Sequence, residues 1–134
     1  MVDESGYVRA GAEELADFLA SRSAAVITGA GLSTDSGIPD YRSPNAPKRT
    51  PMTWQDFEGS EERRKRYWSG AAIGWRRFDK FSPNAGHRAL AQLEISGHVR
   101  GIATQNVDGL HLRAGSKRVI ELHGHLRSVR CLEC

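Results

Sequence analysis

The apolar run over residues 24–28 constrains the fold of this chain most, because it ends abruptly at Gly29 and Gly31. Small and β-branched residues in such a run are typical of a buried parallel strand. The two glycines can adopt positive φ and have no Cβ, so backbone N–H groups after the strand can approach a phosphate closely. Glycine pairs after apolar runs also form simple tight turns. The pattern predicts a nucleotide-binding turn.

The residues after Gly31 do not follow the pattern of a dehydrogenase. That pattern requires a third glycine at the start of a helix, and an acidic residue about 20 residues further on at the end of a second strand. The polar stretch 33–42 contains Pro39. It predicts a loop that wraps a ligand rather than a helix that leads away from it.

The rest of the chain has the pattern of an alternating α/β fold. Apolar or aromatic residues recur at helical spacing in three segments, where we expect helices: 10–21, 58–78 and 85–95. Residues 45–54 predict a loop, and Pro83-Asn84 predicts the start of the third helix. Short apolar runs predict buried strands over 99–104 and 118–122. Polar residues follow each strand, where an open α/β sheet binds its ligands.

Composition argues against several classes of function. The 19 basic and 16 acidic residues give a net charge of +3, which is too small to indicate nucleic-acid binding. The basic cluster Arg63–Arg66 could be a nucleic-acid or import patch, but its acidic and aromatic neighbours favour the solvated face of a helix. The two cysteines argue against a disulfide framework. Since no apolar run suits a membrane span or a signal peptide, we expect a cytoplasmic protein without nucleic-acid or membrane partners.

Four blocks of sequence resemble, in the same order, the motifs of sirtuins, the NAD-dependent protein deacylases: Gly29–Arg42, Thr104–His111, Glu121–Gly124 and Cys131–Cys134. They resemble the cofactor loop, the second NAD motif, the catalytic-histidine motif and the first half of the zinc site. Residues between Arg66 and His87 further resemble the class II branch of the family. The resemblance begins near Leu15 and covers only the first half of a sirtuin, so we expect this chain to be a fragment.

The resemblance implies a Rossmann-like parallel sheet flanked by helices, an inserted small helical module, and the start of a zinc-binding module. Residues 1–134 would form part of one catalytic domain. Its implied parts are a nucleotide-binding part at about 10–44 and 84–124, a helical module at about 45–83, and the first half of a zinc module at about 125–134.

The resemblance also implies NAD as the cofactor and assigns roles to individual residues. His123 would be the general base, because a histidine that titrates near neutrality can take a proton from a ribose hydroxyl. Asp108 would bind the nicotinamide carboxamide. Without the resemblance, Asn106 and Asp108 predict only a turn. The implied cofactor-binding residues are Gly29, Ala30, Gly31, Ser33, Thr34, Ile38, Pro39, Asp40, Tyr41, Arg42, Gln105, Asn106, Val107 and Asp108.

Cys131 and Cys134 have the spacing of a zinc knuckle, which supplies two of the four ligands of a structural Zn²⁺ site. The resemblance implies that a later cysteine pair supplies the other two. His123 and His125 formally complete a Cys₂His₂ set with these cysteines, an alternative that would consume the implied base. A thioredoxin-like redox role fits less well, because its cysteine pair should open a helix.

The implied reaction transfers the acyl group of a lysine in a protein or peptide substrate to ADP-ribose and releases nicotinamide. Protein ADP-ribosyl transfer is a variant of the same chemistry with a different nucleophile. A non-catalytic NAD- or zinc-binding fragment is the alternative from another class. We expect the 134-residue chain alone to be inactive and to hold zinc poorly.

Overall fold

The computed structural model describes residues 4–40, 50–131 and 133. The predictions made for Tyr41, Arg42 and Cys134 therefore lie outside the described residues. Within them, no helix is long and apolar enough to cross a membrane.

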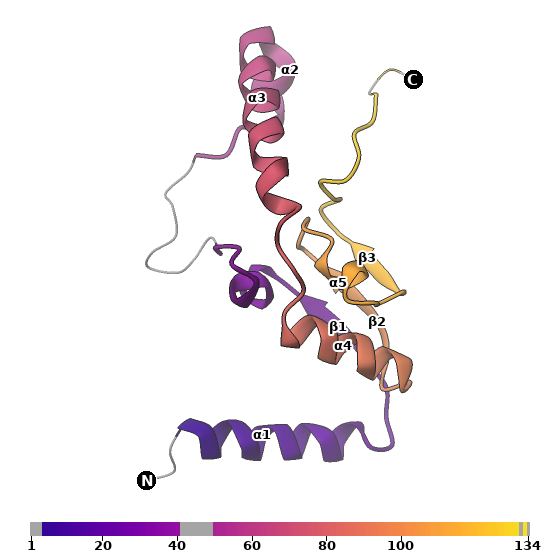
Figure 1. Ribbon diagram of the computed structural model, residues 1–134. Coiled ribbons are helices and arrows are strands. Elements are labelled where there is room, and N and C mark those ends of the chain that lie inside the picture. The colour runs from indigo at the N-terminus through magenta and orange to yellow at the C-terminus, as the bar shows by residue number, and fades with distance from the viewer. Residues whose placement is uncertain (1–3, 41–49, 132, 134) are drawn as a thin grey trace.

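Three parallel strands form the sheet, in the order β1 (Ala24–Thr28), β2 (Val99–Thr104) and β3 (Val119–Glu121). Thr28 pairs with Thr104, and Thr104 pairs with Glu121, so all three strands end at one edge (Figure 1). The predicted bounds of strands 24–28 and 99–104 are confirmed, whereas β3 is shorter than the predicted 118–122. The prediction that β1 and β3 are buried was wrong among the described residues, because one face of the sheet is left uncovered there. This shared carboxyl edge places the residues after each strand next to one another.

Five α-helices are present among the described residues: α1 (Glu4–Leu19), α2 (Trp54–Gly59), α3 (Glu61–Phe78), α4 (Ala85–Ile95) and α5 (Leu110–Arg113). The prediction of α4 is confirmed, and those of α1 and α3 are confirmed with shifted ends, whereas α2 and α5 were not predicted. The start signal before α4 is a capping box, in which the Asn84 side chain accepts from the His87 N–H at 3.2 Å. The Asn84 amide also donates to the Leu32 carbonyl at 2.6 Å. That bond ties the beginning of α4 to the segment after β1.

The segment after β1 differs from its prediction. Residues Ala30–Ser36 form a 3-10 helix, η1, so the prediction of a loop over 33–42 was wrong over 33–36. The helix ends at Gly37, which has φ 88°, and residues 38–40 have no regular structure. Backbone bonds of the i to i+3 type run from Leu32 N to Gly29 O at its start and from Gly37 N to Thr34 O at its end. The Thr34 hydroxyl also donates to the Gly31 carbonyl.

Helices α2 and α3 lie side by side and extend away from the sheet (Figure 1). Phe57 and Tyr67 pack edge to face between them, with ring centroids 5.3 Å apart. Within the basic cluster of α3, Arg63 pairs with Asp56, and Lys65 pairs with Glu61 at 2.8 Å. These ion pairs on an exposed helix are what the interpretation as a solvated helix face predicts.

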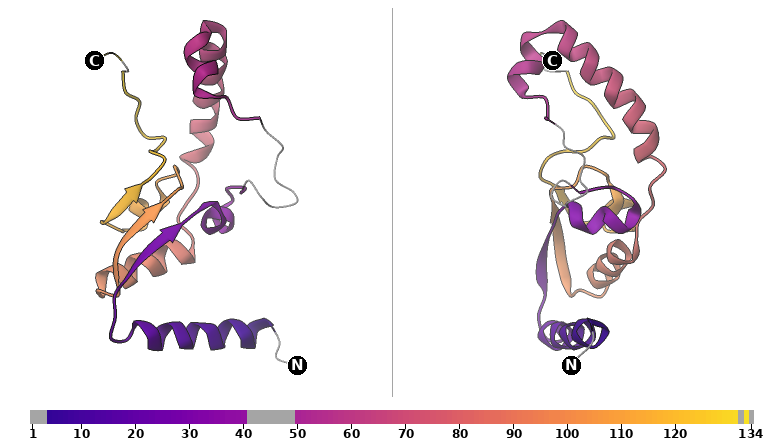
Figure 2. Two further views of the ribbon diagram at one scale, coloured as in Figure 1. Left: turned by 180° about the vertical axis from the view of Figure 1, so that it is seen from behind. Right: turned by 90° about the vertical axis from the view of Figure 1, so that its left-hand side faces the viewer.

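The two faces of the sheet are covered unequally. Val99 and Ile102 of β2 are 2% and 1% exposed. Helix α4 contacts β2 and lies on one side of the sheet (Figure 2). On the opposite face, Ile27 and Ile120 are 76% and 66% exposed. The described residues therefore build a parallel α/β sheet with one helix-covered face, and the site lies where its strands end.

Candidate functional site

The ends of β1 and β2 are joined by hydroxyl groups. Thr28 Oγ1 donates to Thr104 Oγ1 at 2.8 Å, and the Asn106 N–H donates to the same Thr104 oxygen at 3.1 Å. The Gln105 N–H donates to the Thr28 carbonyl at 3.0 Å. Paired threonines on neighbouring strands therefore fix where each chain leaves the sheet.

Beyond the strand ends, three predicted cofactor-binding side chains are in direct contact. The Asn106 amide donates to Ser33 Oγ at 3.1 Å and to the Gly29 carbonyl at 3.0 Å. Ser33 Oγ donates to Asp108 Oδ2 at 2.8 Å, and Asp108 Oδ1 accepts from the Leu110 N–H at 2.9 Å. We call Thr28, Ser33, Thr104, Asn106 and Asp108 the strand-end network.

The bonds of Asp108 show features of a turn and also a contact with a distant motif block. The bond from Leu110 N, and the φ of 72° at Gly109, are what a simple turn would show. The bond from Ser33 is different, because it spans 75 residues and its donor is only 1% exposed. Asp108 is therefore part of a buried contact between two motif blocks as well as a turn residue.

The space in front of the glycine turn is open. A Cβ at Gly31 would meet nothing within 4 Å, and one at Gly29 would meet only Gln105 Oε1 at 3.9 Å. Neither glycine has positive φ, so that part of the prediction was wrong. What the glycines provide is an exposed backbone that a ligand can approach without a side chain in the way.

Two buried histidines adjoin the strand-end network, and neither was predicted as a site residue. His87 and His111 are 0% and 2% exposed, and their ring centroids are 5.0 Å apart. His111 Nε2 forms a hydrogen bond with Thr28 Oγ1 at 2.9 Å, while His87 Nδ1 forms one with Asn84 Oδ1 at 3.0 Å. The signals that sequence could have offered were the capping position of His87 and the place of His111 in the second NAD block.

Burial lowers the pKa of both His87 and His111, because a charged imidazole would lose its hydration there. The carboxylate of Asp108 opposes this decrease of the pKa at each ring. Neither His87 Nε2 nor His111 Nδ1 has a hydrogen-bond partner among the described residues. An N–H formed there by protonation would therefore have no acceptor among them. Both rings are therefore neutral near pH 7, and they support the network by packing and by the bond to Thr28.

His123 lies just beyond β3, on the same edge of the sheet. The Leu122 N–H donates to the Thr104 carbonyl at 2.8 Å, and the Gly124 N–H donates to the Glu121 carbonyl at 3.0 Å. The His123 side chain is exposed, and Gly124 has φ 73°. We call residues 122–131 the His123 segment.

Seven further residues of the predicted cofactor-binding set are described and are less buried than Ser33 and Asn106. Thr34, Pro39 and Gln105 are exposed. Four residues are half-buried: Ala30, Ile38, Asp40 and Val107. Among the described residues, the structure thus brings Ser33, Asn106 and Asp108 into direct contact.

The described residues do not assemble a metal site. Cys131 is exposed, and Cys134 lies outside the described part of the chain. No group of three or more His, Cys, Asp or Glu side chains among the described residues could hold a metal ion. The alternative Cys₂His₂ site is therefore wrong for this structure, because His123, His125 and Cys131 do not converge.

Comparison with known proteins identifies the family of this fold and site. The profile of the Sir2 family matches residues 29–134. NAD-dependent protein deacetylase 1 of Mycobacterium avium is 56% identical over 126 residues, which are 94% of this chain and 45% of the relative. An NAD-dependent protein deacylase of Monosiga brevicollis is 54% identical over 109 residues, which are 81% of this chain and 35% of the relative. The chain belongs to the Sir2 family, and the resemblance to sirtuins is confirmed.

Solved structures agree with this assignment. A Sir2 structure with a p53 peptide and NAD⁺ is 40% identical, with a TM-score of 0.77, over 90% of this chain and 49% of that one. A mutant Sir2 homologue in complex with ADP-ribose is 38% identical, with a TM-score of 0.80, over 91% of this chain and 50% of that one. The α/β fold prediction is confirmed, and the chain spans about half the length of these relatives.

Proposed function

We propose that this chain forms the NAD-binding half of a protein-lysine deacylase, which transfers the acyl group to ADP-ribose and releases nicotinamide. The observation that carries the proposal is the buried bond from Ser33 to Asp108, since it joins the first NAD block to the second at the carboxyl edge of the sheet. The relatives' names support NAD dependence and deacylation, and the Sir2 structure with a p53 peptide supports an acyl-lysine peptide as the partner.

The residues of the site have the hydrogen-bonding capacity that NAD requires. Both donors of the Asn106 amide are used internally, which leaves its oxygen to accept. Each carboxylate oxygen of Asp108 accepts one internal bond and keeps a lone pair, which suits the N–H groups of a carboxamide. The exposed backbone at Gly31 would face the phosphates. All of the cofactor-binding residues predicted above are part of this proposal.

NAD supplies the ribose carbon from which nicotinamide leaves and the ribose hydroxyls that receive the acyl group. His123 is the general base in this proposal, and its exposed imidazole is open to a ribose hydroxyl at the strand edge. Cys131 and Cys134 would supply two thiolates to a structural Zn²⁺, with the other two ligands coming from outside these 134 residues. A cytoplasmic location and the lack of nucleic-acid or membrane partners stay predictions.

The experiment that tests the proposal uses a chimera. In it, this chain replaces the matching part of the Mycobacterium avium deacetylase, to which it is 56% identical over 126 residues. Nicotinamide release from NAD⁺ is measured with and without peptides that carry acetyl, lipoyl, biotinyl or longer acyl groups on lysine. We expect release only with an acyl-lysine peptide, because the acyl oxygen is the nucleophile.

The control is the same chimera with His123→Ala, which shows whether activity depends on residues of this chain. Equal release with and without peptide would contradict deacylation and would favour NAD hydrolysis or ADP-ribosyl transfer. We also expect the 134-residue chain alone to be inactive in this assay.

A further inference from the structure

An ion pair joins Glu121 to Arg127, the first and last residues of the loop 121–127 that carries His123. Arg127 Nη2 donates to both carboxylate oxygens of Glu121, at 2.9 and 2.7 Å. The two side chains are 35% and 13% exposed, respectively. Because the carboxylate is largely removed from water, this pair is screened less than a surface ion pair. It holds the two ends of the segment 121–127 together.

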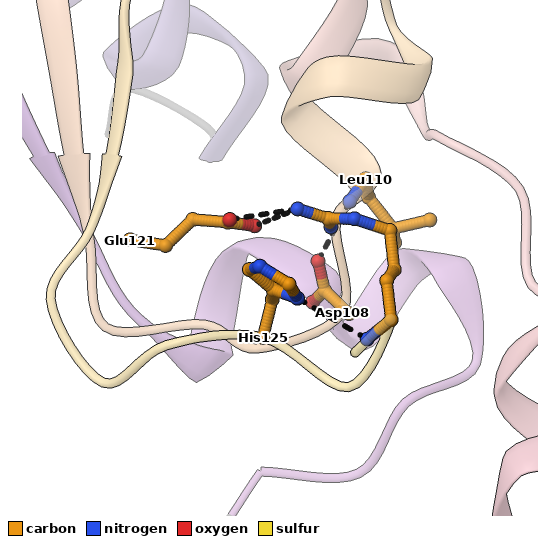
Figure 3. A network of polar contacts seen from close by, with 5 residues as sticks. Asp108, Leu110, Glu121 and His125 are labelled. Atoms are coloured by element: carbon orange, nitrogen blue, oxygen red, sulfur yellow. Dashed lines mark hydrogen bonds and ion pairs between the residues drawn. The ribbon is translucent and has the colours of Figure 1, made fainter. Parts of the chain in front are cut away.

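Arg127 also contacts the second NAD block. A Cβ at Gly109 would clash with its guanidinium, so the arginine occupies the space that a side chain would need there. The neighbouring Leu126 N–H donates to the Val107 carbonyl at 3.1 Å. Figure 3 shows Asp108, Glu121 and His125 close together in this region. Arg127 therefore joins the His123 loop to the residues beside Asp108.

His123 has little else to fix its direction. Its side chain is exposed, and the next residue, Gly124, adopts a φ of 73° that favours glycine. The Arg127 N–H donates to His125 Nδ1 at 3.3 Å, which adds a second tie within the loop. The direction of the His123 ring thus depends on the backbone between Glu121 and Arg127.

We propose that Arg127 is a positioning residue, which aims His123 by clamping the loop to Glu121 and to the turn at Gly109. This inference rests on the proposed function, because it takes His123 as the general base. Loss of the clamp should lower kcat more than it changes the KM for NAD⁺. The reason is that none of the hydrogen bonds given above for the strand-end network involves Arg127, so the proposed NAD-binding groups keep their partners.

The first test is independent of activity. Amide hydrogen exchange is measured in the 134-residue chain and in its variants Arg127→Gln and Arg130→Gln. Arg130 is an exposed arginine three residues further along and serves as the matched control. We expect exchange of the amides 122–126 to become about tenfold faster in Arg127→Gln, with the β2 amides unchanged. Arg130→Gln should change neither group.

The second test uses the chimera. Arg127→Gln and Glu121→Gln should each lower kcat about tenfold and change the KM for NAD⁺ less than about threefold. Arg127→Lys should recover part of the lost kcat, because an ammonium can replace Nη2 at Glu121 but not the rest of the guanidinium at Gly109.

Two results would overturn the proposal. One is exchange over 122–126 that does not differ between Arg127→Gln and the unchanged chain. The other is a kcat for Arg127→Gln equal to that of the unchanged chimera. A chimera that releases nicotinamide without any acyl peptide would instead contradict the proposed function, and the exchange result would still decide the role of Arg127.

Discussion

The strand-end network and the His123 segment lie on the same edge of the sheet but are held in very different ways. In the network, Ser33 and Asn106 are 1% and 8% exposed, and their side chains bond to each other and to the backbone. In the segment, His123 is exposed, and the structure depends on a few backbone bonds and on one ion pair. The proposed cofactor-binding groups thus contact one another directly within this chain, whereas the proposed base lies on a loop held by a few backbone bonds and one ion pair.

The largest effect should come from a substitution in the exposed His123 segment. His123→Ala in the chimera should lower the rate of deacylation at least about 100-fold, because it removes the proposed general base. NAD⁺ affinity should change less than about threefold, since His123 lies outside the buried network. Steady-state kinetics and calorimetry on the same sample check both expectations. Comparable losses of affinity and rate would place His123 in cofactor binding instead.

The second-largest effect should come from a substitution in the buried strand-end network. Ser33→Ala would leave the Asn106 amide and an Asp108 oxygen without their partner, at a cost of about 1–3 kcal/mol. We therefore expect about 10- to 100-fold weaker NAD⁺ binding, measured by calorimetry. Thr34→Ala is the matched control, because that exposed neighbour bonds only to the Gly31 carbonyl and should cost less than about 0.5 kcal/mol. Equal effects of the two variants would mean that the buried network does not organise the site.

A smaller effect should follow from pH. Because burial lowers the pKa of His87 and His111 below the ordinary value of 6.5, the unfolded chain binds more protons than the folded one as pH falls. The free energy of unfolding of the chimera should therefore be fully present above about pH 7 and decrease as pH falls through 6.5. Each histidine contributes a slope of at most about 1.4 kcal/mol per pH unit.

Denaturant unfolding between pH 5 and 8 checks this prediction. His111→Gln should flatten the pH dependence, because the amide keeps a hydrogen bond to Thr28 and cannot be protonated. The chimera without this substitution, measured in the same buffers, is the reference. An unchanged slope in His111→Gln would mean that His111 is not the group that titrates.

Much of this arrangement could be predicted from local patterns. The β1 run, the Asn84 cap and the α4 periodicity each act over a few residues, and the structure confirms all three. The helix η1 could not be predicted, because the glycines of its first turn disfavour helices and its contacts, such as Ser33 with Asp108, come from far along the chain.

The buried histidines and the arginine clamp also escaped prediction, for a related reason. Periodicity does not show that His87 and His111 face each other across α4 and α5, since that depends on how the helices pack on the sheet. The pair of Glu121 with Arg127 requires the turn at Gly124, whose φ of 73° is set by the folded loop. Residues that depend on packing between distant elements are those that sequence alone misses.

The central claim is that cofactor binding belongs to the strand-end network and base catalysis to the His123 segment. One calorimetric titration of NAD⁺ into the chimera variants Asp108→Ala and His123→Ala tests it most directly. The account predicts at least about tenfold weaker binding for Asp108→Ala, which loses the carboxylate that Ser33 and Leu110 hold in place, and nearly unchanged binding for His123→Ala. Unchanged binding in Asp108→Ala together with weakened binding in His123→Ala would contradict it.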